Sequence, residues 1–214
     1  GGAGADNFDV SAVTLANFGD IVVDLGAGND TLTIGSKHDT DTGSQFTGGD
    51  GIDTVNVAAT PITAAAFAAN LTGFEVLQFG MTGNNSQDMD LAAGMNIVSV
   101  DTAIATSALT ISDAADGLII RLDGSLLSAV DAGLTTSDED INQVVVSVKT
   151  DTANDDVTLE IGGTLGDVNL ITLDPATTYE TVKVVSSGAS ANAIQTIGTT
   201  INNMPFTGST ALSL

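Results

Sequence analysis

Cysteine is absent from the 214 residues, and histidine occurs only once, at position 38. Without cysteine the chain has no disulfide framework, no thiolate metal site and no cysteine nucleophile. One histidine cannot supply a multi-histidine metal site or the H-E-x-x-H motif of zinc proteases. The G-x-S-x-G motif of serine hydrolases is also missing. No apolar run approaches the roughly 18 residues of a membrane-spanning helix. We therefore expect a protein that is neither an enzyme nor inserted in a membrane.

Basic residues are almost as scarce. Four lysines and arginines stand against 27 acidic residues, which gives a formal net charge of −23. Such a surface repels nucleic acids and anionic membranes, because both are bound through basic patches. Only 14% of the residues are charged and 43% are hydrophobic, so the chain is not a disordered acidic tail. Of the acidic residues 23 are aspartates, whose short side chains favour turns. This composition predicts a folded protein that attracts cations.

Three segments share one glycine and aspartate pattern. They are Gly1–Asp9, Leu25–Thr33 and Gly48–Asn56, and they match the nonapeptide G-G-x-G-x-D-x-U-x. Glycine permits a tight turn with carbonyl groups on one side, and the aspartate adds an anionic oxygen. Loops of this kind, stacked about 4.8 Å apart, enclose oxygen-lined gaps that suit Ca²⁺. Three ordinary glycine and aspartate turns are the alternative, but the near-constant spacing of the repeats argues against it.

These repeats resemble the RTX family of secreted bacterial proteases, lipases, toxins, adhesins and surface-layer proteins. In that family, loop carbonyls and the aspartate carboxylate bind calcium. Leu25 departs from the pattern, because it stands where the first glycine is expected. Three stacked loops enclose two gaps, so we expect about two ions along one edge of the coil. The resemblance implies Asp6, Asp30 and Asp53 as carboxylate ligands and the loop residues Gly2, Gly4, Gly26, Gly28, Gly49 and Gly51, with Gly1 and Gly48 also shaping the loops.

Apolar segments that alternate with polar residues recur every 21 to 26 positions along the chain. This rhythm predicts an all-β, right-handed parallel β-solenoid or β-roll. We expect an RTX calcium-binding β-roll over 1–58, a continuing solenoid with short helical insertions over 59–156, and a C-terminal β region over 157–214. A β-sandwich-like C-terminal part is the alternative after residue 156, where the spacing shortens. The expected strands include 21–23, 75–79, 96–100, 118–122, 144–148, 157–161, 169–173 and 181–185.

Two short helices are expected to interrupt the strands. The pair Thr60 and Pro61 is typical of a helix start, and Gly73 is a suitable end. A weaker second helix is expected over 125–130, before Gly133.

The remaining acidic clusters are interpreted as solvated loops, with further calcium sites as the alternative. They lie at 39–41, at 138–140 and at 151–156. Asp20 and Asp24 flank the expected strand at 21–23, where charge would protect a sheet edge. We expect His38 to lie in a surface loop.

The segment Leu71–Leu77 resembles a phrase that follows the calcium repeats in RTX surface-layer proteins. The resemblance implies a secreted protein, exported by type I secretion, that self-assembles into a calcium-dependent lattice on the bacterial cell surface. Its expected partners are further copies of itself and a cell-surface polysaccharide bound through other parts of a longer chain, since residue 1 lies within a glycine motif. Two alternatives remain: the stalk or binding segment of a large RTX adhesin, and the calcium-folding secretion tail of an RTX hydrolase.

Overall fold

Short strands build the fold, and in strands such as Thr31–Ile34 and Thr54–Val57 the side chains alternate between buried and half-buried positions. The structure is a computed structural model, and it describes residues 1–13, 20–36, 38, 42–80, 85–100, 109–122, 144–161, 167–168, 171–173, 179, 181–186 and 193–194. The chain divides into two compact units. The first comprises Gly1–Met81 and Gln87–Ser99, and the second comprises Thr82–Ser86 and Val100–Leu214. Each unit is described by itself.

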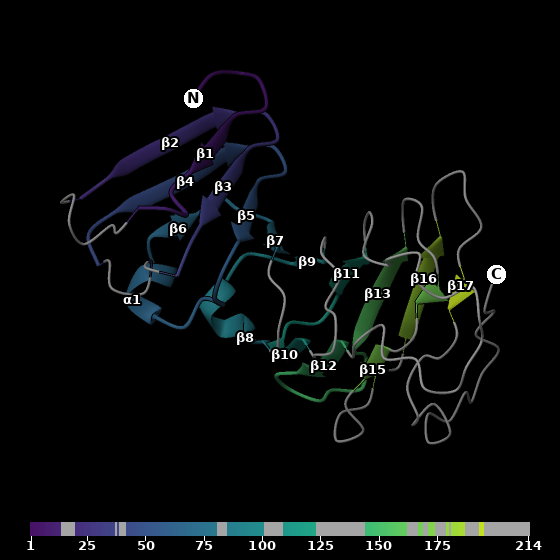
Figure 1. Ribbon diagram of the computed structural model, residues 1–214. Helices are drawn as coiled ribbons and strands as arrows, with labels where there is room; N and C mark the ends of the chain where they lie inside the picture. The colour runs from purple at the N-terminus through teal and green to yellow at the C-terminus, as the bar shows by residue number, and fades with distance from the viewer. Residues whose placement is uncertain are drawn as a thin grey trace. The chain divides into compact units, whose positions relative to one another are not determined.

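The first unit stacks its strands in two rows (Figure 1). One row has the order β1-β3-β5-β7-β9, and the other has the order β2-β4-β6. The pairs with a defined register are all parallel, and each joins strands one turn apart in the chain. This is the predicted parallel β-solenoid. The strands are β1 (Asn7–Asp9), β2 (Val22–Ala27), β3 (Thr31–Ile34), β4 (Gln45–Asp50), β5 (Thr54–Val57), β6 (Leu71–Thr72), β7 (Val76–Phe79) and β9 (Ile97–Val100).

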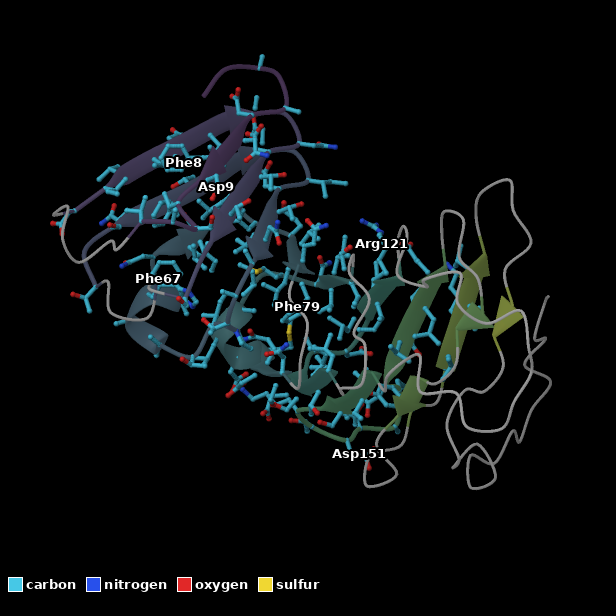
Figure 2. The ribbon with its side chains drawn as sticks, in the orientation of Figure 1. Phe8, Asp9, Phe67, Phe79, Arg121 and Asp151 are labelled. Carbon is cyan, nitrogen blue, oxygen red and sulfur yellow. The ribbon has the colours of Figure 1, made fainter. Side chains whose placement is uncertain are left out.

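The core of this unit consists of columns of apolar side chains at equivalent positions of successive turns. Leu32 pairs with Val55 and Val55 with Leu77, and all three are completely buried. Phe46 and Phe67 fill the space beside the second row, with ring centroids 6.1 Å apart. Figure 2 shows the side chains of this core as sticks, with Phe67 and Phe79 labelled. These columns hold the turns in register, and this register places the glycine loops of successive turns over one another.

Helix is confined to single turns among the described residues. The helix α1 (Ala65–Ala68) begins four residues later than Pro61, and Ala64 at its N-cap makes no side-chain hydrogen bond. The expected helix between Thr60 and Gly73 is therefore wrong in both bounds. It ends before Gly73 because the chain re-enters the second row of strands at β6. A 3-10 helix, η3 (Met89–Ala92), follows β8 (Asn85–Asp88) and was not predicted. The expected helix at 125–130 lies outside the described residues.

The second unit repeats the same architecture. One row has the order β15-β12-β10, another contains β11, β13 and β16, and β14 pairs with β17. Every described pair after residue 156 is parallel, which is the pairing of a solenoid rather than of a sandwich. No helix among the described residues is long and apolar enough to cross a bilayer. The strands are β10 (Leu109–Ala114), β11 (Leu118–Leu122), β12 (Val144–Val148), β13 (Asp156–Ile161), β14 (Asp167–Val168), β15 (Ile171–Leu173), β16 (Thr181–Ser186) and β17 (Ala193–Ile194).

Candidate metal site at the glycine loops

The parallel register places the three nonapeptides directly over one another. The backbone N–H of Thr31 donates to the carbonyl of Asp6, and that of Thr54 donates to the carbonyl of Asp30, both at 2.8 Å. In the second row, Gly26 pairs with Gly49. Asp6, Asp30 and Asp53 therefore occupy the same place on consecutive turns, as the repeat spacing predicts.

The aspartates form a ladder of hydrogen bonds between turns. The backbone N–H of Asp6 donates to Oδ1 of Asp30 at 2.7 Å. The backbone N–H of Asp30 donates to Oδ1 of Asp53, again at 2.7 Å. Asp30 and Asp53 are completely buried, whereas Asp6 is half-buried. Each carboxylate thus fixes the position of the turn before it.

The second oxygen of each buried carboxylate has no hydrogen-bond donor. Oδ2 of Asp30 and Oδ2 of Asp53 are both inaccessible to solvent and unpartnered. Oδ2 of Asp6 differs, because it accepts a hydrogen bond of 2.9 Å from the backbone N–H of Gly2. A buried anionic oxygen without a partner is costly, so native structures normally satisfy it with a donor or a cation. Two such oxygens lie on adjacent turns, where a cation would satisfy them.

The loop glycines bring the backbones of successive turns close together. Gly49 and Gly51 have φ values of 120° and 143°, and a Cβ on either would overlap the carbonyl oxygen of Gly26 or Gly28 respectively. Gly26 and Gly28 also have positive φ, at 99° and 139°. Only glycine permits this backbone conformation together with such a close approach between turns.

Not every predicted loop residue follows this pattern. Gly2 and Gly4 do not have positive φ, and a Cβ on either would meet no atom within 4 Å. Leu25, which replaces the first glycine of its repeat, is only 4% exposed, so its side chain contributes to the core. The second and third loops therefore share the positive-φ glycines, whereas the first loop lacks them.

Glu75 extends the ladder by one turn and was missed as a site residue. The backbone N–H of Asp53 donates to Oε2 of Glu75 at 2.9 Å. The Asp53 carboxylate accepts the corresponding bond from the backbone N–H of Asp30, one turn earlier. A sequence signal existed, because Glu75 lies 22 residues after Asp53 and directly precedes the strand that begins at Val76.

The ladder concentrates negative charge in a buried place. Burial is the main cause that raises the pKa of Asp53, and the nearby charges of Asp30, Glu75 and Asp50 raise it further. The hydrogen bond from the backbone of Asp30 acts in the opposite direction without offsetting these effects. A cation in the adjacent gap would remove this electrostatic cost.

The donor set suits a hard cation. Among the described residues, no three acidic, histidine or cysteine side chains converge on one point, so most ligands would have to come from the backbone. Calcium commonly combines carboxylates with backbone carbonyls in flexible geometry, whereas Mg²⁺ requires a stricter octahedron. The loops offer both kinds of oxygen, in their backbone carbonyls and in the unpartnered Oδ2 atoms of Asp30 and Asp53.

No family model, curated protein or solved structure matches the chain. The repeats and their geometry are therefore the basis for what is proposed below.

Two other expectations are corrected by the structure. His38 is 1% exposed rather than in a surface loop, since its ring packs 5.0 Å from that of Phe67 and its Nδ1 contacts the carbonyl of Gly35. Asp155 is also buried, because its carboxylate accepts hydrogen bonds from the backbone N–H and the hydroxyl of Thr152, at 2.6 and 2.7 Å.

The other acidic residues lie at the surface or outside the described chain. Asp151, labelled in Figure 2, is exposed, as is Asp156. Asp20 and Asp24 are exposed on either side of the start of β2, where they were expected. The clusters at 39–41 and 138–140 lie outside the described residues.

Proposed function

We propose that this chain is a calcium-stabilised structural segment of a secreted bacterial surface-layer protein, which assembles with further copies of itself into an extracellular lattice. The observation that supports calcium binding is that Oδ2 of Asp30 and Oδ2 of Asp53, on adjacent turns of the ladder, are both buried and unpartnered. The surface-layer assignment comes from the resemblance of the repeats and of Leu71–Leu77 to that class of RTX proteins.

In this proposal calcium acts on folding. An ion that binds only the native loops stabilises the native state by mass action, and it offsets the repulsion between Asp30 and Asp53. At low calcium inside the cell the chain would remain unfolded and suited to export by type I secretion. At the millimolar calcium outside the cell it would fold.

A calcium titration of the chelated protein tests the folding step. We expect calcium to increase β-structure in circular dichroism and to raise the unfolding temperature. Asp30→Ala should bind about one ion fewer and fold at higher calcium concentration. Asp24→Ala, which removes an exposed carboxylate of the same turn, is the matched control and should behave like the wild type. An unchanged calcium stoichiometry in Asp30→Ala would refute the loop assignment.

Electron microscopy of the protein with calcium tests the assembly step. Ordered two-dimensional sheets that dissolve in chelator are expected. Persistent monomers at millimolar calcium would contradict the lattice. Glycan binding without sheets would instead favour an adhesin segment, and a parent gene that encodes H-E-x-x-H or G-x-S-x-G upstream would favour the tail of a hydrolase.

A further inference from the structure

The turn that follows the third nonapeptide lacks the glycine motif but reproduces its geometry. β4 and β6 pair Phe46 with Leu71 and Thr47 with Thr72, so Gly73 lies in register with Gly48. A Cβ placed on Gly48 would overlap the carbonyl oxygen of Gly73 and would lie 2.7 Å from Oδ2 of Asp53. The Gly73 carbonyl and the unpartnered, buried Oδ2 of Asp53 therefore border the same small space.

The first gap between nonapeptides has the same arrangement. A Cβ placed on Gly1 would overlap both the carbonyl oxygen of Leu25 and Oδ2 of Asp6. In both gaps, the carboxylate of one turn faces the carbonyl at the first loop position of the next turn. The Gly73 carbonyl thus lies in the position that the Leu25 carbonyl has in the first gap, although the sequence around Gly73 does not match the nonapeptide.

Glu75 supplies the acid that this turn would otherwise lack. Its Oε2 accepts the N–H of Asp53, as Asp30 and Asp53 accept the N–H of the residue one turn earlier. Its longer side chain reaches the same place from a turn that contains fewer glycines. Glu75 is half-buried, and its Oε2 accepts the backbone N–H of Asp53, the residue whose Oδ2 borders this gap.

We propose that Asp53, Glu75 and the carbonyl of Gly73 form a further cation site, beyond the two gaps enclosed by the nonapeptides. This inference rests on the proposed calcium binding of the loops and extends it by one turn. The ligand is a hard divalent cation, and Ca²⁺ fits best because carboxylate and carbonyl oxygens are its usual partners. The site joins the glycine-loop segment to the part of the first unit that continues without nonapeptides.

Counting bound ions in Glu75→Gln tests the site. The glutamine keeps an oxygen that can accept the N–H of Asp53, so the ladder hydrogen bond and the fold are retained while the charge is lost. Native mass spectrometry of the full chain, titrated with calcium acetate, should show one ion fewer in Glu75→Gln than in the wild type. Asp24→Asn removes a charge from an exposed position of the same unit that is not among the charges acting on Asp53, and it should leave the ion count unchanged.

The outcomes separate this inference from the proposed function. An equal ion count in the wild type and Glu75→Gln, together with a loss in Asp30→Asn, would overturn the additional site and leave the loop sites standing. No loss in either variant would overturn both.

A location experiment keeps the inference testable if Glu75→Gln does not fold. Crystals of the wild type grown with Tb³⁺ should show an anomalous peak within about 2.3–2.6 Å of the Gly73 carbonyl and the Asp53 carboxylate. Peaks confined to the gaps among the three nonapeptides would refute the site.

Discussion

Asp53 accepts a hydrogen bond of 2.7 Å from the backbone N–H of Asp30, although 23 residues separate the two along the chain. The bond joins equivalent points of consecutive turns, and it leaves Oδ2 of Asp53 buried without a donor. A side chain of the repeat motif thus serves as structural support through one oxygen and as a candidate ligand through the other.

Replacing Gly51 by alanine should destabilise the first unit strongly. Its φ of 143° is unfavourable for alanine, and the added Cβ would overlap the carbonyl oxygen of Gly28. We expect a loss of roughly 2–4 kcal/mol in the free energy of unfolding, measured by urea denaturation. Gly4→Ala changes the equivalent position of the first repeat, where a Cβ meets nothing within 4 Å, and should cost less than about 0.5 kcal/mol. Equal losses in the two variants would contradict the stacked loop geometry.

The pH dependence of the metal-free protein should report on Asp53. Its pKa in the folded state lies above the ordinary value of 3.8, chiefly because of burial. The folded state therefore binds more protons than the unfolded state between these two pKa values, and stability falls as pH rises through that window. The destabilisation by ionised Asp53 is absent below its ordinary pKa and complete above its pKa in the folded state.

The variant Asp53→Asn isolates this effect. In chelator, it should remove the corresponding part of the pH dependence while its amide oxygen still accepts the N–H of Asp30. In saturating calcium, the same variant should be less stable than the wild type, because a ligand is lost. Thermal unfolding from pH 3 to 8, with and without calcium, measures both, and an identical pH profile for the two proteins in chelator would show that Asp53 titrates normally.

Gln87 should be required for the stability of the first unit, although it lies in no repeat. Its buried side chain accepts the N–H of Ile62 at 2.9 Å and donates to the carbonyls of Ile62 and Asp88, at 3.2 and 2.7 Å. Gln87→Leu preserves the volume but leaves these buried backbone groups unpaired, at a cost of about 2–3 kcal/mol. Gln45→Ala, on the exposed side of β4, is the control and should remain within about 0.5 kcal/mol of the wild type in the same urea titration.

The side chains of the apolar columns should contribute more to the free energy of unfolding than exposed apolar residues of the same sheets do. Leu32 is completely buried between Phe8 and Val55, so Leu32→Ala should cost about 2–5 kcal/mol by loss of burial and creation of a cavity. Val22 is 74% exposed, and Val22→Ala should change stability by less than about 0.5 kcal/mol. Similar losses of stability for both would mean that the columns are not the core.

The sequence predicts the repeating parts of this protein well. Alternation of apolar and polar residues predicts β13 to within one residue, because one face of the strand must be buried. The spacing of Asp6, Asp30 and Asp53 predicts that they stack, since parallel strands of equal turn length bring equal positions together.

Features that depend on one tertiary contact could not be predicted in the same way. His38 is buried because the ring of Phe67, 29 positions later, covers it, and no local pattern indicates this contact. The helix expected between Thr60 and Gly73 ends at Ala68, because Leu71 pairs with Phe46 as part of β6. Glu75 was overlooked because the motif specifies aspartate, whereas the geometry requires only a carboxylate that reaches the previous turn.

The direction of the bonds between turns has a mechanical consequence. In the first unit, both the β-ladder hydrogen bonds and the bonds from Asp30, Asp53 and Glu75 run along the stacking direction. Tension along that direction would load one pair of turns at a time, and an ion held in a gap would lie in line with the force. Calcium would then act as a cross-link between turns at the glycine-loop edge, and its removal would lower the force at which neighbouring turns separate.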